Sequence, residues 1–353
     1  MSLERPSFTK GMRTFSKTTN MKNILLPIAA FMAFFAASCT TQPQATADTA
    51  FIRPPYLQPG DTVGLMVVSS HVTHRKGESD TLIDVVKSWG VNVKLGKNLF
   101  KKDNPPFSVS DKERAEEFME MIMDDNIKAI LFYRGGYGAI RTLEYLDFEQ
   151  IRKHPKWVIG FSDVTTYHLM MQNIGMESMH APMLSSYWLK RRPDSAAISV
   201  GNAIMGKTKG YHIKPHPFNR LGKAEGKIMG GNMTLISIAE GTPYQMPVDD
   251  NTIIFIEEIG ESLNAVDGMM QQLKKSGKLN KAKAILVGNF TDISDKEDPW
   301  NITPEELIKR YTDELDVPVV FGFPAGHGRP HLAIYMGRNV QLSVREDGVD
   351  LTF

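Results

Sequence analysis

The sequence predicts an α/β protein with two lobes, an N-terminal lobe built on a parallel sheet and a C-terminal α/β lobe that is richer in β-structure. In the first half of the chain, short apolar runs alternate with amphipathic stretches at the spacing typical of βαβ units. This alternation breaks over residues 184–222, which are rich in Lys, Arg, Pro and Gly. The roughly 300 residues from Tyr56 onward are enough for two lobes.

The N-terminal lobe is expected to span residues 55–183. Ser110 begins one of its helices, because Glu113 lies three positions further on and completes a capping box. The other predicted helices cover residues 80–89, the segment that ends at Leu146 and residues 164–173, and the predicted strands cover residues 61–69, 91–95, 128–133 and 157–160.

Residues 184–222 are expected to form a linker or cap, with one helix over residues 196–205. The C-terminal lobe is expected to follow over residues 223–353. Its predicted strands cover residues 226–229, 252–257, 282–288, 317–321, 333–336 and 340–344, and its predicted helices begin at Asn232, Leu263 and Pro304.

The composition is that of an ordinary globular protein, since hydrophobic residues make up 42% and charged residues 23% of the 353-residue chain. The 41 basic and 40 acidic side chains leave a formal net charge of +1. A nucleic-acid surface needs a clearly basic face, so no nucleic-acid partner is expected. The single cysteine, Cys39, excludes a disulfide within the chain and argues against a cysteine-based metal site.

Residues 1–39 are predicted to be a signal region. A basic start near Lys22 precedes an apolar run over residues 24–37 that is too short to span a bilayer comfortably, and small residues lead to Cys39. The segment resembles the lipobox of bacterial lipoproteins, in which the cysteine is acylated and becomes the first mature residue. The alternative is a plain signal peptide that is cleaved elsewhere. Residues 1–20 precede a second, more natural start at Met21, and we interpret them as a misassigned start.

Residues 40–54 are rich in Thr, Gln, Pro and Ala, have no apolar period and are predicted to be a flexible tether. Acyl chains on Cys39 would hold the domain at a membrane through their buried CH₂ groups. These features predict an exported protein, lipid-anchored to a bacterial cell membrane, with its folded domain in the periplasm or outside the cell.

Ser162 follows an apolar strand that ends at Gly160, and it precedes a predicted helix. This is the geometry of a nucleophile elbow, in which a sharp strand-to-helix turn presents the hydroxyl. The N–H groups that follow lie at a helix N-terminus, where they can stabilise an oxyanion. The alternative is that Ser162 or Asp163 simply caps the helix. Val164 breaks the G-x-S-x-G pattern, which argues against an ordinary α/β-hydrolase.

Three further segments place functional residue types at strand ends. Residues 134–138 (RGGYG) contain glycines that can expose backbone N–H groups to a ligand, and the alternatives are a phosphate-binding loop or a plain glycine turn. Glu257 follows the apolar residues 253–256, where the alternative is an exposed strand terminus. His327 lies in a glycine-flanked loop that suits a general base, and the alternative is a surface histidine.

Four segments follow one another along the chain, namely FYRGGYGAIRTLEYLDF, WVIGFSDVT, IMGGNMTLI with FIEEIGE, and GFPAGHG. In this order they resemble the LD-carboxypeptidases, and the resemblance covers residues 55–353. Members of this family are serine peptidases that act on muramoyl tetrapeptides, and the microcin-immunity peptidases are their relatives. Family members are often homodimers, so the resemblance raises a homodimer as an expectation here.

The resemblance implies a Ser-Glu-His triad. Ser162 would be the nucleophile, His327 the base that takes its proton, and Glu257 the carboxylate that fixes the imidazole tautomer and stabilises its cation. The oxyanion hole would combine the backbone N–H of Asp163 with one from the glycine loop, that of Gly136. No cofactor is expected.

The resemblance also implies the substrate, a peptidoglycan-derived tetrapeptide from which cleavage of an L-to-D amide releases the terminal D-alanine. Arg134 is a candidate clamp for the free carboxylate, and a structural ion pair is the alternative. Asn232 either lines the cleft or caps the helix that follows it. No metal is expected, since the histidines of the chain form no H-E-x-x-H pattern.

Two alternatives remain open. One is a microcin-immunity-like amidase that acts on peptide–nucleotide conjugates, with Tyr187 and Trp188 as aromatic residues over the site. The predicted export argues against it, because such toxins are processed in the cytoplasm. The other is a non-catalytic surface-binding lipoprotein that retains the fold, and the three filled triad positions argue against that.

Overall fold

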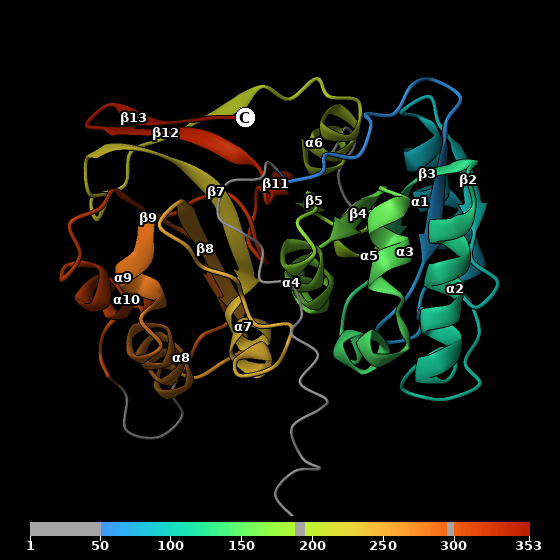
Figure 1. Cartoon of the computed structure of the whole chain (residues 1–353), viewed down its shortest axis with the longest axis horizontal. Helices are drawn as coiled ribbons and strands as arrows, with labels where there is room; N and C mark the ends of the chain where they lie inside the picture. Colours follow the sequence, from blue (N-terminus) through green and yellow to red (C-terminus); the bar gives the residue numbers. More distant parts are fainter. Residues whose placement is uncertain (1–50, 188–194, 295–299) are drawn as a thin grey trace, which may run out of the picture. The chain divides into compact units, whose positions relative to one another are not determined.

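The computed structural model describes residues 51–187, 195–294 and 300–353, and all of them belong to one unit of the chain, Ala45–Phe353 (Figure 1). The predicted signal region, Cys39, nearly all of the predicted tether, and Trp188 lie outside the described residues. Within the described ranges, no helix has both the length and the apolar character needed to cross a membrane.

The first sheet has six strands in the order β11-β5-β4-β3-β1-β2. Its strands are β1 (Thr62–Met66), β2 (Asn92–Leu95), β3 (Ile127–Phe132), β4 (Trp157–Gly160), β5 (Ser178–His180) and β11 (Ile334–Met336). The five that come from the N-terminal lobe run parallel, which confirms the predicted parallel sheet. The central strands β3 and β4 are buried along nearly their whole length, as is usual where helices cover both faces of a sheet.

Helices cover both faces of this sheet because alternate residues of a strand point in opposite directions. Leu131 of β3 joins the core that contains Leu82 of α1, and Phe132 joins the core that contains Phe118 of α2. The helical segments of this lobe are α1 (Lys76–Lys87), α2 (Asp111–Met123), η1 (Ala139–Tyr145), α3 (Phe148–Lys153), η2 (Ser162–Val164) and α4 (Thr165–Asn173).

Local signals decide where these helices begin. The capping box predicted at Ser110 is present, with the Ser110 N–H donating to Glu113 Oε2 at 3.0 Å. The segment before Leu146 differs from the expected helix, because η1 is a 3₁₀ helix that ends at Tyr145. A separate helix, α3, follows because the Asp147 carboxylate accepts from the Gln150 N–H at 3.0 Å and caps a new N-terminus.

Residues 184–222 contribute to both lobes. They contain α5 (Leu184–Tyr187), the predicted helix α6 (Ser195–Ile204) and an unpredicted strand, β6 (Gly210–Ile213). Val200 of α6 is buried in the first lobe's core, whereas β6 pairs with β13 at the edge of the second sheet. The segment predicted as a linker therefore carries a structural element of each lobe.

The second sheet has seven strands in the order β10-β9-β8-β7-β12-β13-β6, and it is mixed. β7, β8, β9 and β10 run parallel, while β12, β13 and β6 add an antiparallel edge. The new elements are β7 (Gly222–Asn232), α7 (Met233–Ala239), β8 (Thr252–Ile259), α8 (Leu263–Lys275), α9 (Lys278–Lys281), β9 (Ala282–Thr291), α10 (Pro304–Thr312), β10 (Val319–Val320), β12 (Asn339–Arg345) and β13 (Gly348–Thr352).

Strand β11 was expected in the C-terminal lobe but belongs to the first sheet, where it pairs antiparallel with β5. The reason lies in its two faces. Tyr335 packs in the first lobe's core with Trp157, whereas Ile334 and Met336 pack in the second lobe's core with Phe255. One short strand thus buries its alternate side chains in both lobes, beside β5 in Figure 1.

Candidate active site

Ser162 occupies a strained turn between β4 and the helical segment η2. Its φ is 62°, in the left-handed region that residues other than glycine rarely adopt. Gly160 makes the turn tight, since a Cβ at that position would lie 2.9 Å from Val164 Cγ2. A non-glycine residue in this conformation persists only where its surroundings hold it, and such strain gathers at functional turns. The turn therefore has the backbone geometry of a nucleophile elbow.

Glu257 and His327 form a hydrogen-bonded pair. Glu257 Oε2 lies 2.7 Å from His327 Nδ1, and the carboxylate, near the end of β8, is fully buried. Because a carboxylate oxygen accepts, Nδ1 carries the proton in this pair, and Nε2 is the nitrogen that can act as a base. Gly326 lets the loop pass this close, since its φ is +111° and a Cβ there would lie 2.7 Å from Glu257 Oε2.

The histidine loop also contacts the turn that carries the serine. The rings of Phe161 and His327 have centroids 4.8 Å apart, and Phe161 immediately precedes Ser162. Phe161 also meets His331 edge-on at 4.6 Å. Ser162 of the first lobe and His327 of the second lobe therefore lie on adjoining loops.

The glycine loop, residues 134–138, lies against Ser162. A Cβ on Gly135 would lie 3.2 Å from Ser162 Cβ and 3.3 Å from its Oγ. Gly136 has a φ of +121°, and a Cβ there would lie 2.4 Å from Ser70 Oγ. The Tyr137 N–H donates to the same hydroxyl at 3.4 Å. The loop backbone at Gly135 is thus close to the serine, and the place of Gly136 in an oxyanion hole stays a prediction.

Comparison with known proteins shows the family of the chain. Residues 63–181 match the LD-carboxypeptidase N-terminal domain, and residues 225–342 match the LD-carboxypeptidase C-terminal domain. A probable murein peptide carboxypeptidase of Bacillus subtilis (strain 168) is 34% identical over 298 residues, which cover 83% of this chain and 92% of the relative. The chain belongs to the LD-carboxypeptidase family.

Solved structures agree with this family assignment. Muramoyltetrapeptide carboxypeptidase from Oxalobacter formigenes superimposes with a TM-score of 0.74 at 25% identity, covering 82% of this chain and 97% of that one. MccF in complex with glutamyl sulfamoyl guanosine superimposes with a TM-score of 0.75 at 23% identity, covering 84% and 97%. Both structures support the two-lobed α/β fold. The likeness to MccF, at 23% identity, supports nothing beyond the fold.

Arg134, the predicted carboxylate clamp in this LD-carboxypeptidase, is half-buried at the start of the glycine loop. It donates to the His71 carbonyl at 3.1 Å and to the Gly135 carbonyl at 3.2 Å. Burial lowers the pKa of its guanidinium. Among the described residues no carboxylate lies within ion-pair distance of Arg134, so the structural ion pair is not observed there. Its contact with a substrate stays a prediction.

Asn232 caps helix α7, which was the alternative to a place in the cleft. Its side-chain oxygen accepts from the Leu235 N–H at 3.3 Å, and its amide donates to Glu258 Oε1 at 2.8 Å. The side chain is 3% exposed. Both ends of the amide are therefore used by the fold, and its contact with a substrate also stays a prediction.

Sequence reasoning missed a group of buried histidines beside the site. The rings of His180 and His331 have centroids 5.3 Å apart, and no residue in the described ranges hydrogen-bonds their ring nitrogens. Burial lowers the pKa of His331 to about 3, that of His168 to about 4 and that of His180 well below its usual value. These rings are neutral at neutral pH, so they add no positive charge around His327.

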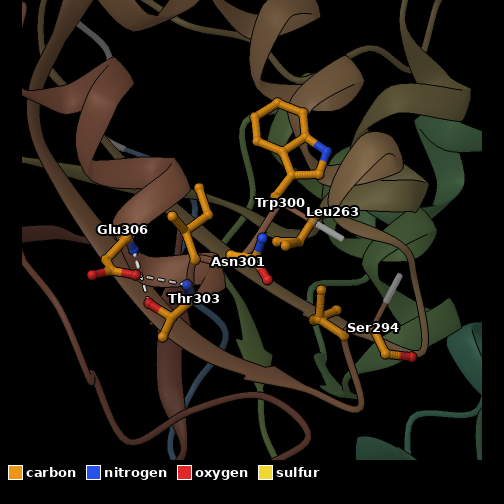
Figure 2. A pocket seen from close by; sticks show the side chains of 8 residues that line it. Leu263, Ser294, Trp300, Asn301, Thr303 and Glu306 are labelled. Carbon is orange, nitrogen blue, oxygen red and sulfur yellow. Dashed lines mark hydrogen bonds between the residues drawn. The ribbon is translucent and has the colours of Figure 1, made fainter. Parts of the chain in front are cut away.

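A separate pocket opens near the first turns of α8 and α10 (Figure 2). Its wall includes the capping box in which the Glu306 N–H donates to Thr303 Oγ1 at 3.1 Å. The residues that line it are Leu263, Ile293, Ser294, Trp300, Asn301, Ile302, Thr303 and Glu306, and none of them is a predicted site residue. We assign no part of the chemistry to this pocket.

Gly326→Ala is expected to slow the reaction of Ser162 with a fluorophosphonate probe by about 100-fold, the order expected when a catalytic group moves by about 1 Å. The added methyl would displace the Glu257–His327 pair. Gly241→Ala is the matched control, because Gly241 also has positive φ, +77°, but a Cβ there meets nothing within 4 Å. Labelling rates measured by intact mass check this. Equal rates in the two variants would contradict the proposed role of the loop.

Proposed function

We propose that this protein is a serine carboxypeptidase of the L,D type, which releases the C-terminal D-alanine from peptidoglycan stem tetrapeptides. The observation that carries the proposal is the buried Glu257–His327 pair, which lies against the Phe161–Ser162 turn. The names of the Bacillus subtilis and Oxalobacter formigenes relatives support the substrate class, a murein peptide and a muramoyl tetrapeptide.

The reaction divides into acylation and deacylation. Ser162 Oγ attacks the carbonyl carbon of the L-residue while His327 Nε2 takes the hydroxyl proton, and Glu257 stabilises the imidazolium. The tetrahedral oxyanion accepts hydrogen bonds from the N–H groups of Asp163 and Gly136. Its collapse breaks the C–N bond, and His327 protonates the departing D-alanine amine. Water, deprotonated by His327, then hydrolyses the ester and restores the Ser162 hydroxyl.

The terminal carboxylate of the substrate needs a cation, and Arg134 supplies it in this proposal. A guanidinium has five N–H donors, and the two carbonyl contacts of Arg134 occupy its Nε and one Nη. The remaining donors can form a charge-assisted pair with a carboxylate. A clamp of this kind favours a peptide that ends at the scissile residue, as a carboxypeptidase requires.

The amidase alternative lacks a specific observation in its favour. It rested on Tyr187 and Trp188, of which Trp188 lies outside the described residues. The likeness to MccF at 23% identity carries the fold alone. A non-catalytic binding role would leave no reason for a buried carboxylate to be paired with a histidine beside a strained serine.

Release of D-alanine from a disaccharide tetrapeptide tests the proposal, with purified protein that begins at residue 40. Ser162→Ala is expected to lower the rate by at least about 10⁴-fold, as in other triad enzymes. Ser88→Ala, at an exposed position after α1, is the control and should leave the rate unchanged. Mass spectrometry of the product measures the release. A wild-type protein that releases no D-alanine, or a Ser162→Ala protein that matches it, would sink the proposal.

We further propose that the protein is exported and anchored by acyl chains on Cys39. The support is the basic, apolar and small-residue order before that cysteine. The enzyme would then meet intact wall or imported fragments outside the inner membrane. The homodimer suggested by the family resemblance remains a prediction.

Labelling of cells with a clickable fatty acid tests the anchor. The wild-type protein should carry the label and partition into the detergent phase, because buried acyl chains provide the membrane affinity. Cys39→Ala should lose the label, and Ser38→Ala serves as the neighbouring control. An unlabelled wild-type protein, or a label that survives Cys39→Ala, would refute the anchor without affecting the peptidase proposal.

A further inference from the structure

The Asp163 side chain lies inside the protein. Its carboxylate is 1% exposed, and one of its oxygens, Oδ2, has two donors. The Ser69 hydroxyl donates to it at 2.5 Å and the Ala139 N–H at 2.8 Å. Ser69 follows β1 and Ala139 directly follows the glycine loop. One carboxylate therefore joins three chain segments that meet at the carboxyl edge of the first sheet.

Arg114 of α2 contacts the last residue of the same glycine loop, Gly138. Its side chain is fully buried, and one guanidinium nitrogen, Nη1, donates to the Gly138 carbonyl at 3.2 Å and also to the Val68 carbonyl. The guanidinium lies 4.4 Å from the centroid of the Phe107 ring. Gly138 must stay small here, because a Cβ would lie 2.4 Å from Phe107 Cε1.

Neighbouring groups partly offset the cost of burying these two charges. Burial raises the pKa of Asp163, and the two hydrogen bonds and the charge of Arg114 oppose that effect. Burial likewise lowers the pKa of Arg114, and the neighbouring Asp111 carboxylate, which forms an ion pair with it, opposes the shift. A buried carboxylate and guanidinium persist where such partners are present and are costly where one is removed.

We propose that the side chains of Asp163 and Arg114 are positioning residues that hold the glycine loop where its Gly136 N–H can donate to the oxyanion at Ser162. This inference rests on the proposed peptidase function and concerns how the oxyanion hole is built. Gly138 is fixed through Arg114, Ala139 through Asp163, and Tyr137 through Ser70. Since Asp163 also supplies the other proposed N–H, one residue sets both halves of the hole.

Oxyanion donors stabilise the transition state more than the bound substrate. Loss of the Asp163 contacts that position the glycine loop should therefore lower kcat and leave KM nearly constant. With full-length protein and the disaccharide tetrapeptide, Asp163→Ala is expected to lower kcat by about 100-fold, the loss typical of one oxyanion donor. Asp163→Asn retains an oxygen that can accept from Ser69 and Ala139, and it should recover most of that loss.

Glu117→Ala is the matched control. Glu117 lies on α2, three residues after Arg114, and is 2% exposed. Its carboxylate accepts from the Asn98 N–H at 2.8 Å, and in the described structure it makes no hydrogen bond to the glycine loop. The Glu117→Ala protein should unfold at a lower urea concentration than the wild type, as Asp163→Ala does, but its kcat should be unchanged. An Asp163→Ala protein with wild-type kcat would overturn the proposed positioning role of Asp163. An Asp163→Asn protein whose kcat is no higher than that of Asp163→Ala would overturn it too.

Ser69→Ala covers the case in which Asp163→Ala does not fold. Ser69→Ala removes a single donor to Asp163 and should lower kcat by about 10-fold at constant KM. This is less than the loss of about 100-fold in kcat that removal of a whole oxyanion donor causes. An unchanged kcat in Ser69→Ala would then overturn the inference. A wild-type protein without D-alanine release would instead refute the peptidase function itself, so the two failures are distinguishable.

Discussion

The hydrogen bond between Glu257 and His327 is the interaction on which the rest of the site depends. A fully buried carboxylate is costly unless it is paired, and the partner that the described structure provides for Glu257 is the histidine Nδ1. The pair requires glycine at position 326, where a Cβ would lie 2.7 Å from the carboxylate. Because the carboxylate accepts a hydrogen bond from Nδ1–H, Nε2 is the ring nitrogen that can serve as the base.

The two lobes supply different halves of the chemistry, and strand β11 joins them. The first lobe carries Ser162 and the glycine loop, whereas the second carries Glu257 and His327. The histidine loop runs through His331, which packs on Phe161, and then into β11, which pairs with β5 of the first sheet. A chain segment of ten residues thus contains both the base and the strand that ties its lobe to the nucleophile's sheet.

Much of this arrangement could be predicted from local patterns, and the remainder depends on tertiary contacts. The turn at Ser162 and the cap at Asn232 follow from residue types at a strand-to-helix junction. The partner of β11 could not be predicted, because a three-residue strand carries no signal for pairing with a strand about 150 residues earlier. The inward turn of Asp163 and the buried histidines were missed for the same reason, since each depends on neighbours that are distant in sequence.

The position of the proton on the neutral His327 ring tests whether Glu257 orients this histidine. Nitrogen chemical shifts of the ¹⁵N-labelled imidazole distinguish the two neutral tautomers, and His327→Gln assigns the resonances. At a pH where the ring is neutral, we expect a proton on Nδ1, hydrogen-bonded to Glu257, and no proton on Nε2. Glu257→Gln should change this tautomer, because an amide can donate to Nδ1. A neutral His327 with its proton on Nε2 in the wild-type protein would show that Glu257 does not orient the base in this way.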